Sequence, residues 1–418
     1  MLAPRRYSAV TRDDRAARYT AGPPGGPRLK ILLVHEHYRS ASPSGEDAMF
    51  QAEHALLARA GHTVVTYEVH NDSIGSSAWS RARAAADTIW SASTSRALTQ
   101  LIGRAKPDVA HFHNTFPLIS PSAYAACRSA AVPVVQTLHN YRLICPGGLL
   151  LRGGAPCEAC VGTSLVPALR HACYRDSHAA TAAVVGMLLA HRALGSYRHN
   201  VDRYFVLTDF ARELFVRGGL PADRLVVRPN GLTDDPGVGC GDGGYALYIG
   251  RLSAEKGIAT LVRAWRRDAP LPLVIVGDGP QRAELEGLAD GDAAIRFIGT
   301  QPRAHVYELL RSATMLVMPS ECYEGLPVTF MEALACGTPI AATRIGALGT
   351  LMEDGVNGVH FPPRAPEALI AAVRRLLDRP RELAEIRARN RALFESRYSP
   401  AMDLRSLEEN YAAVVAAR

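Results

Sequence analysis

The chain has 418 residues, 48% of them hydrophobic, and a mean hydropathy of −0.02. This length is more than one hydrophobic core usually organises, so we expect a globular protein of two domains. The formal net charge of +7 is mild for the length, and no Lys/Arg block interleaves with aromatic residues, which argues against a nucleic-acid-binding protein. A basic face for an anionic ligand or membrane surface is one interpretation of the charge, and scattered surface arginines are the other.

The chain begins with a polar segment, 1–28, that is rich in Arg, Pro and Gly and predicts a flexible leader rather than a signal peptide. The longest apolar stretch, 179–190, is shorter than the roughly 18 residues that a membrane-spanning helix needs. We expect a core helix there, with peripheral membrane contact as the alternative. The protein is therefore predicted to be cytoplasmic.

The predicted first domain, 29–229, is a doubly wound α/β unit. Strands are expected at 29–35, 62–69, 109–114, 132–139, 201–207 and 225–228, and helices at 48–60, 81–104 and 209–217. The opening strand, loop, helix and strand resemble a Rossmann-type half, although Ser44-Gly45 replaces the full glycine fingerprint. Residues 230–244, rich in Gly and Asp, predict a hinge linker.

Histidines stand at the ends of two of these strands. His111 and His113 alternate and so share one face, Asn114 follows them, and His139 ends the next strand. We expect strand-end histidines at a substrate-facing edge, because ligands bind at the carboxyl ends of parallel strands. A metal site at His111 and His113 is less favoured, because no third ligand stands nearby in the sequence. For His139, a histidine that merely satisfies its hydrogen bonds is the alternative.

A cysteine-rich insertion, 145–173, interrupts the first domain. Cys145, Cys157, Cys160 and Cys173 follow the spacing C-x11-C-x2-C-x12-C. Four cysteines with a central CxxC in a cytosolic chain predict a tetrahedral structural zinc site, with reduced thiols as the alternative.

The predicted second domain, 245–398, repeats the α/β pattern, and a final helix within 399–418 is expected to cross back onto the first domain. Strands are predicted at 245–249, 272–279, 295–298, 313–318, 340–343 and 357–361, and helices at 328–336, 365–378, 381–394 and 403–417. The acidic pairs at 234–235 and 290–292 lie in turns, and no metal is assigned to them.

Two cations follow the first strand of this second domain. Arg251 and Lys256 flank a turn that ends at Gly257, and the chain has only two other lysines, Lys30 and Lys106. The Arg251 guanidinium can bind a phosphate group through two parallel hydrogen bonds, and the Lys256 ammonium adds a compact positive charge. Together, at the end of a strand, they are suited to binding a diphosphate. Surface charges without a ligand are the alternative.

The stretch 318–341 is the most informative part of the sequence. A buried strand leads into a loop with Glu324 and Gly325, a helix over 328–336 follows, and Gly337 and Pro339 end that helix. The loop amides and the helix N-terminus form an anion site. Glu324 could reach groups above the phosphate and Glu332 a neighbouring diol; a surface glutamate and a solvated helix glutamate are the alternative.

This stretch resembles the paired-glutamate signature of retaining GT-B glycosyltransferases of family 4, and the resemblance extends from about residue 29 to the end. It implies two Rossmann-like domains that face a central cleft, with the acceptor on the first and the donor on the second. The segment 111–174 resembles a bacterial branch that acts in surface-polysaccharide assembly. The loop EGLP is shorter than the glycine-rich form of many relatives, so sugar specificity is not transferable.

The resemblance also implies roles for individual residues. Arg251 and Lys256 hold the leaving diphosphate, Glu324 lies beside the donor sugar, Glu332 holds the ribose, and His139 points at the sugar. Gly45 faces the donor phosphates, and His111, His113 and Asn114 are acceptor-side candidates. The remaining donor contacts are expected from the loop and the start of its helix, namely Gly325, Leu326, Pro327 and Val328.

The expected activity is transfer of N-acetylglucosamine or another hexose from a UDP-sugar to an alcohol, with retention and without a catalytic metal. The acceptor is either an aminocyclitol of an antibiotic pathway or a lipid-linked saccharide, and only the second brings the protein to the inner face of the membrane. Alternatives are a nucleotide-sugar epimerase or phosphorylase of the same fold, or a non-catalytic nucleotide-sugar-binding partner. A dinucleotide dehydrogenase is disfavoured, because the full glycine fingerprint is missing.

Overall fold

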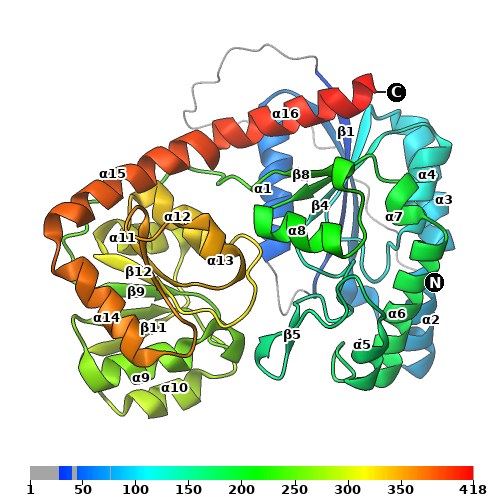
Figure 1. The fold of residues 1–418 in the computed structure, drawn as a ribbon. Coiled ribbons are helices and arrows are strands. Elements are labelled where there is room, and N and C mark those ends of the chain that lie inside the picture. Colours follow the sequence, from blue (N-terminus) through cyan, green and yellow to red (C-terminus); the bar gives the residue numbers. More distant parts are fainter. Residues whose placement is uncertain (1–27, 40–44, 76, 418) are drawn as a thin grey trace.

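The computed structural model describes residues 28–39, 45–75 and 77–417, so nearly all of the predicted leader lies outside the described residues. The chain forms two α/β lobes, each built on a six-stranded sheet (Figure 1). All strand pairs recorded in these two sheets are parallel, which confirms the predicted fold class.

The first sheet has the strand order β2-β1-β3-β4-β7-β8, so the direction of winding reverses between β1 and β3. Every residue of β3 and β4 is buried, as expected for a parallel sheet with helices on both faces. The strands are β1 (Lys30–His37), β2 (Thr63–His70), β3 (Val109–Phe112), β4 (Val134–Leu138), β7 (Arg203–Val206) and β8 (Leu225–Val227).

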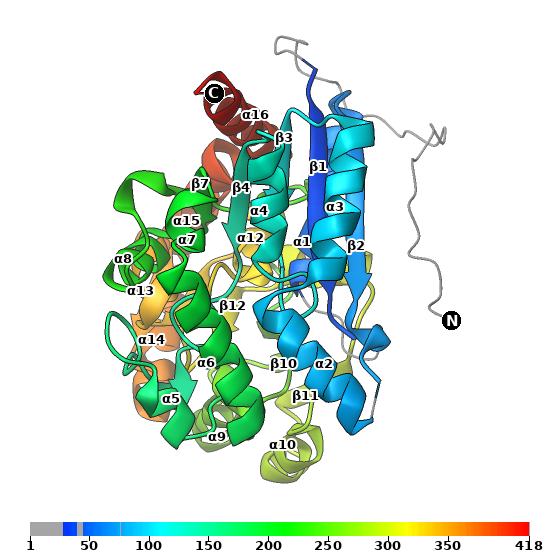
Figure 2. The same ribbon diagram turned by 90° about the vertical axis from the view of Figure 1, so that its right-hand side faces the viewer.

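The prediction of a single helix over 81–104 is wrong, because the chain breaks at Trp90 and the Ser91 side chain caps a new helix by accepting from the Thr94 amide. The helices of this lobe are α1 (Gly45–Arg59), α2 (Ala78–Ile89), α3 (Ala92–Ala105), α4 (Ser122–Ser129), α5 (Val166–Arg170), α6 (His178–Ala193), α7 (Ser196–His199) and α8 (Asp209–Arg217), with 3-10 turns at Asn71–Ser73 and Ala222–Arg224. Figure 2 shows α2 and α6 side by side on one flank.

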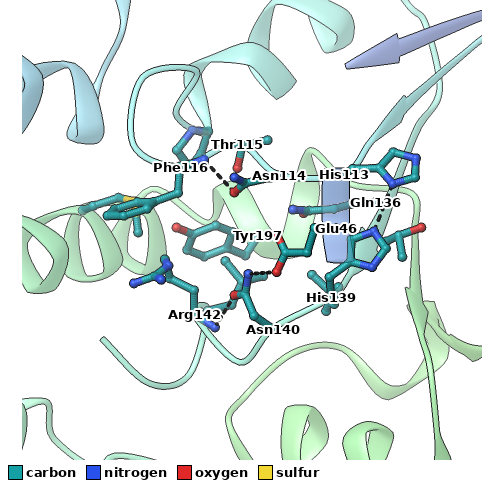
Figure 3. A pocket seen from close by; sticks show the side chains of 15 residues that line it. Glu46, His113, Asn114, Thr115, Phe116, Gln136, His139, Asn140, Arg142 and Tyr197 are labelled. Atoms are coloured by element: carbon teal, nitrogen blue, oxygen red, sulfur yellow. Dashed lines mark hydrogen bonds between the residues drawn. The ribbon is translucent and has the colours of Figure 1, made fainter. Parts of the chain in front are cut away.

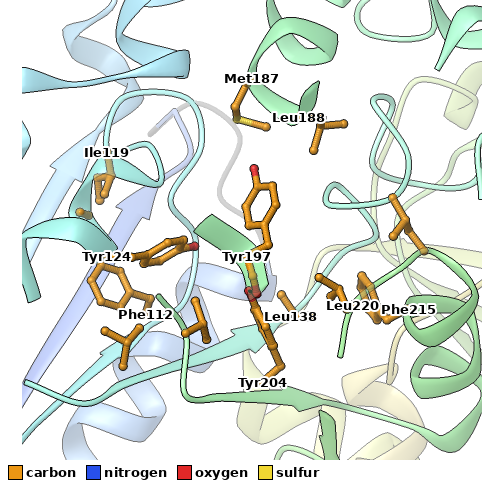
Figure 4. Packing of buried hydrophobic residues seen from close by; sticks show 14 of the residues in the cluster. Phe112, Ile119, Tyr124, Leu138, Met187, Leu188, Tyr197, Tyr204, Phe215 and Leu220 are labelled. Atoms are coloured by element: carbon orange, nitrogen blue, oxygen red, sulfur yellow. Dashed lines mark hydrogen bonds between the residues drawn. The ribbon is translucent and has the colours of Figure 1, made fainter. Parts of the chain in front are cut away.

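Buried aromatic side chains fill the space beneath the sheet of the first lobe (Figure 4). The rings of Phe112 and Tyr124 meet edge to face with centroids 5.0 Å apart, and the Tyr124 hydroxyl donates to Gln136 Oε1 at 2.8 Å. Tyr204 donates to the Tyr197 carbonyl at 2.8 Å. Because their polar groups are paired, Tyr124 and Tyr204 can be buried without an unsatisfied hydroxyl.

The second sheet has the order β11-β10-β9-β12-β13-β14, which is the Rossmann order with its switch point between β9 and β12. Its strands are β9 (Ala246–Ile249), β10 (Leu273–Val276), β11 (Ile295–Gly299), β12 (Met315–Met318), β13 (Ile340–Thr343) and β14 (Gly358–Phe361). Its helices are α9 (Ile258–Asp268), α10 (Arg282–Ala289), α11 (Arg303–Ser312), α12 (Val328–Cys336), α13 (Gly346–Leu351), α14 (Pro366–Leu377) and α15 (Pro380–Arg397), with a 3-10 turn at Ala254–Lys256.

The last helix, α16 (Pro400–Ala416), runs from the second lobe back across the first (Figure 1). Leu407 and Tyr411 pack into a cluster with Ile31 and Leu33 of β1. The cysteine-rich insertion carries its own two-stranded antiparallel hairpin, β5 (Leu151–Arg152) and β6 (Ala155–Pro156). No helix of the described residues is long and apolar enough to cross a membrane.

Candidate active site between the lobes

Lys256 and Glu324 form the polar centre of the second lobe's switch point. Lys256 Nζ lies 2.7 Å from Glu324 Oε1 and 2.9 Å from Oε2, and the Ser320 hydroxyl donates to Oε1 at 2.6 Å. Burial lowers the pKa of Lys256, but the neighbouring Glu324 carboxylate outweighs this and raises it above its usual value. Lys256 therefore stays charged.

A glycine makes this pairing sterically feasible. Gly257 has φ +67°, and a Cβ there would come within 1.9 Å of the Pro319 carbonyl oxygen. A side chain at Gly257 would therefore push the Lys256 turn away from the loop that carries Glu324. Gly277 allows a similar approach between the ends of β10 and β9, because a Cβ there would meet the Gly250 carbonyl oxygen at 1.9 Å.

Helix α12 begins just after Glu324 without a side-chain cap. Pro327 occupies the N-cap position and makes no capping hydrogen bond, so the first amides of the helix, including that of Val328, are left for another partner. Gly325, Pro327 and Val328 are partly exposed, whereas Leu326 is buried in the core of the lobe. The start of α12 therefore leaves backbone amides without a side-chain cap next to the loop of Glu324.

Arg251 lies just beyond β9, which pairs directly with β12. Its side chain is exposed, and within the described parts of the chain its guanidinium has no hydrogen-bond or ion-pair partner. Its carbonyl oxygen accepts from the Tyr248 hydroxyl at 3.0 Å, which anchors the backbone. Arg251 and Glu324 therefore follow adjacent strands at one sheet edge, and the Arg251 guanidinium is available to a ligand.

Glu332 lies on the second turn of α12, in the second lobe. Its side chain is 8% exposed, and Oε1 lies 3.7 Å from Arg303 Nε. Burial raises the pKa of Glu332 and Arg303 lowers it, with a net upward shift. A buried carboxylate with one loose ion pair retains capacity to accept from a hydroxyl.

On the first lobe, His139 ends a hydrogen-bonded relay. His139 Nε2 lies 3.0 Å from His113 Nδ1, and His113 Nε2 lies 3.2 Å from Glu53 Oε1. Burial lowers the pKa of both histidines, so both are neutral. Because the ionised Glu53 accepts from His113 Nε2, His113 Nδ1 must accept from His139 Nε2, and His139 Nδ1 keeps its lone pair.

Glu53 is the residue that sequence reasoning missed. Its fully buried carboxylate lies 2.6 Å from His111 Nδ1 and 3.3 Å from Arg228 Nη1. Burial would raise the pKa of Glu53, but these neighbours and His113 hold it well below the usual value. Arg228 also pairs with Asp403, so the network ties α1, β3 and α16 together. No local sequence signal marks Glu53, because its partners are distant in the chain.

The prediction that His111 lies at a substrate-facing edge is wrong. Its side chain is fully buried, its Nε2 lies 2.8 Å from Thr137 Oγ1, and its Nδ1 contacts Glu53 and the Tyr411 hydroxyl. Glu53 supplies the third potential metal ligand that the sequence did not reveal, since its oxygen lies within 4.8 Å of the nitrogens of His111 and His113. The Glu53 carboxylate already forms an ion pair with Arg228, and this positive charge disfavours a metal cation at the same place.

The first lobe has a pocket whose lining includes His113, Asn114 and His139 (Figure 3). Asn114 holds the pocket wall, because its amide donates to the Glu36 carbonyl at 2.8 Å and its Oδ1 accepts from the Phe116 amide at 3.1 Å. The remaining side chains labelled in Figure 3 are Glu46, Thr115, Phe116, Gln136, Asn140, Arg142 and Tyr197.

Glu46 is the carboxylate of this pocket. Oε1 accepts from Asn140 Nδ2 at 2.8 Å, and the Tyr38 side chain also interacts with this carboxylate. Burial raises the pKa of Glu46, with Asn140 and Arg142 opposing the shift. Gly45, one residue earlier, is exposed and has nothing within 4 Å of where a Cβ would stand, so no close backbone approach explains this glycine.

The loops that carry the two halves of the site contact each other where the lobes meet. The Tyr141 hydroxyl donates to the Glu324 carbonyl at 3.4 Å. A Cβ at Gly325 would lie 3.4 Å from the His139 carbonyl oxygen. The loop after β4 and the loop after β12 are therefore in contact, which brings His139 close to the Glu324 loop.

Comparison with known proteins identifies the family. Residues 54–235 match the model described as Glycosyltransferase Family 4, and residues 241–392 match that of Glycosyl transferases group 1. An alpha-D-kanosaminyltransferase of Streptomyces kanamyceticus is 30% identical over 284 residues, which cover 64% of this chain and 67% of the relative. The chain belongs to glycosyltransferase family 4. A D-inositol 3-phosphate glycosyltransferase of Catenulispora acidiphila is 30% identical over 67% of this chain and 66% of that protein.

Solved structures assign the family 4 chain to the GT-B fold. A sucrose-phosphate synthase from Thermosynechococcus elongatus superimposes with a TM-score of 0.68 at 18% identity and covers 94% of this chain and 100% of its own. Anabaena Alr3699/HepE, solved in complex with UDP, gives 0.65 at 17% identity over 92% of this chain and 100% of its own. At these identities the likeness establishes the fold, and with the family it makes this chain a GT-B glycosyltransferase.

Proposed function

We propose that this glycosyltransferase moves N-acetylglucosamine or another hexose from a UDP-sugar to an alcohol, with retention of anomeric configuration. The observation that carries the proposal is the switch point of the second lobe, where charged Lys256, the uncapped start of α12 and the unpaired Arg251 guanidinium gather at one edge. Anabaena Alr3699/HepE has been solved with UDP and glucose, which supports a UDP-sugar donor.

Cleavage at the anomeric carbon moves negative charge onto the departing diphosphate. Arg251 and Lys256 stabilise that charge together with the helix dipole of α12, and each such donor is worth on the order of 3 kcal/mol. These fixed positive groups do the work of a divalent cation, so we propose that catalysis needs no metal. Glu324, held by Lys256 and Ser320, lies beside the sugar, and Glu332 accepts from the ribose hydroxyls.

Retention follows if the acceptor attacks from the face on which the diphosphate leaves, with the diphosphate taking the acceptor proton. The first lobe then contributes orientation rather than charge. The relay from Glu53 through His113 leaves the Nδ1 lone pair of His139 free to accept from a hydroxyl of the donor sugar. Glu46, the carboxylate that lines the pocket beside His139, suits an acceptor hydroxyl.

Two acceptor classes fit. An aminocyclitol or related cyclitol is supported by the similarity to a kanosaminyltransferase and an inositol 3-phosphate glycosyltransferase. A lipid-linked saccharide is supported by exposed apolar side chains on two neighbouring helices, Trp79 of α2 at 79% and Leu189 of α6 at 53% exposure. In that case the first lobe would rest on the inner face of the membrane.

The test is release of nucleotide diphosphate from a panel of UDP-sugars, with and without cyclitol and lipid-linked acceptors. Release that needs an acceptor supports transfer, whereas acceptor-independent epimerisation, phosphorolysis or binding alone would support the alternatives within the same fold. Arg251→Ala and Glu324→Ala should each abolish turnover while circular dichroism remains native. Arg296→Ala, a change to an exposed arginine on β11 of the same lobe, is the matched control and should retain full activity.

A further inference from the structure

The cysteine-rich insertion folds so that its four cysteines surround one small cavity. Cys145, Cys157, Cys160 and Cys173 all line it, together with Leu151, Arg152, Ala159, Pro167 and Ala168. All four thiols are free. They come from three separate turns of the chain, so their convergence is a product of folding and not of sequence proximity.

We propose that these four cysteines bind one Zn²⁺ as a tetrahedral tetrathiolate site that fixes the insertion. Zinc prefers four sulfur or nitrogen ligands in closed structural sites, and a cavity lined by four thiols offers this set. The four sulfur atoms do not all lie within 4.8 Å of one another in this structure. Zinc binding would therefore draw the three turns inward around the ion.

Core packing of Leu150, Val161 and Leu165 fixes part of the insertion, and a metal site would fix the turns that carry the cysteines. The hairpin of the insertion has only two residues in each strand, and short strands of this kind are not stable alone. Leu150 and Ala172 adopt left-handed φ angles of 50° and 48°, which cost roughly 1–2 kcal/mol each in non-glycine residues. Ala172 directly precedes Cys173. Strain of this kind persists only where the surroundings enforce it, and a metal–thiolate bond would do so.

Zinc binding would displace the four thiol protons, because the thiolate is the form that coordinates the ion.

Two histidine clusters are weaker metal candidates. His35, His37 and Asp47 offer three ligand atoms, but His35 Nδ1 accepts from the Asn114 amide at 3.4 Å, so Nε2 carries the proton and is not free for a metal. The Glu53 cluster is already neutralised by Arg228. Arg152 lines the cysteine cavity, but within the described residues no hydrogen bond or ion pair joins its guanidinium to a thiol.

The fixed insertion contacts the catalytic loop across the cleft. Glu158 lies between Cys157 and Cys160, and its Oε1 accepts from the Tyr323 hydroxyl at 2.8 Å. Tyr323 directly precedes Glu324. At the tip of the hairpin, the Gly154 carbonyl accepts from Arg364, which also pairs with Glu321 at 2.6 Å. The zinc site would thus hold the insertion against the loop that carries Glu324.

The test is the zinc content of the full chain, purified without chelator and measured by inductively coupled plasma mass spectrometry. We expect about one zinc per chain. Cys157→Ser and Cys160→Ser should each lower zinc content or zinc affinity by at least roughly 10–100-fold. Substitution of residues that only hydrogen-bond to a metal ligand already causes a loss of this size, and these two residues are themselves proposed ligands. Cys240→Ser, which removes an exposed cysteine outside the cluster, should retain the metal. Glu158→Gln should retain zinc but raise the KM for the donor.

Because cysteine variants could fail to fold, the wild-type chain gives an independent measurement. Replacement of zinc by Co²⁺ should produce the visible absorption and the sulfur-to-cobalt charge-transfer bands of a tetrahedral tetrathiolate. A wild-type chain with no stoichiometric zinc and no such spectrum, or with these cysteines oxidised to disulfides on thiol titration, would overturn the proposal. Metal content is read without any activity assay, so the result does not depend on the proposed transfer reaction.

Discussion

The two lobes use the same fold to build opposite kinds of surface at their switch points. Where β9 meets β12, the second lobe presents Arg251, Lys256 and the start of a helix, all positive. Where β1 meets β3, the first lobe presents buried neutral histidines and their hydrogen-bond partners. Of the 14 histidines in the chain, only His305 and His360 belong to the second lobe.

This difference matches what each lobe is proposed to bind. A diphosphate requires positive charge, whereas a sugar or an uncharged acceptor requires directed hydrogen bonds. A neutral relay also avoids the cost of burying an isolated charge beside the cleft. The one charged group in the relay, Glu53, is buried beneath the histidines and paired with Arg228, so its charge does not reach the ligand surface.

The largest expected effect on stability comes from neutralising the first lobe's buried carboxylate. Glu53→Gln removes the charge that pairs with Arg228 and leaves one accepting oxygen for Arg228 and two histidines, and breaking a buried ion pair of this kind costs about 3–5 kcal/mol. Urea denaturation should measure the loss. Glu286→Gln in the second lobe, which breaks an exposed i,i+4 pair with Arg282, is the matched control and should cost under about 0.5 kcal/mol. Equal losses would contradict the contrast between the lobes.

A second effect is expected from acid, through the buried histidines of the first lobe. Burial lowers the pKa of His35 from 6.5 to about 4 and also lowers the pKa of His113, His139 and His191. The unfolded chain therefore binds protons more readily than the folded one below pH 6.5. The stability that these neutral histidines contribute is fully present above pH 6.5 and is lost as the pH falls towards 4. The loss from His35 alone is on the order of 3 kcal/mol.

Denaturation at pH 7 and at pH 5 would measure this loss. Trp79 and Trp90 report on the first lobe and Trp265 on the second, so single-tryptophan variants resolve the two. Burial raises the pKa of Glu36 to about 8 and that of Asp403 to about 6, and their protonation stabilises the folded lobe as the pH falls. The prediction is therefore a difference: His35→Gln should lose less stability between pH 7 and pH 5 than the wild type does. A variant that loses as much as the wild type would show that His35 does not set the difference.

The sequence predicted the second lobe better than the first, for physical reasons. Helix 328–336 and strand 340–343 have the bounds predicted, because Gly337 in the left-handed region and Pro339 mark them locally. The break at Trp90 depends instead on one serine cap within an otherwise helical pattern.

The same distinction holds for the site. Lys256 and Glu324 each lie in a local motif that the sequence predicted, and the structure brings the two together although 68 residues separate them. The Glu53 network is not local, because it joins α1, β3, β8 and α16. Glu53 stands in no recognisable motif, so His111 was expected at a substrate-facing edge although its side chain is fully buried.

The central claim is that the second lobe grips the donor's diphosphate and the first lobe does not. Calorimetric titration of UDP into wild type, Arg251→Ala, Lys256→Met and His139→Ala tests it directly. The account predicts that both cation variants lose at least roughly tenfold in UDP affinity, with each charge-assisted contact worth about 1.5–3 kcal/mol, while His139→Ala binds UDP as wild type does. Unchanged UDP affinity in Arg251→Ala and Lys256→Met, or an equal loss in His139→Ala, would contradict it.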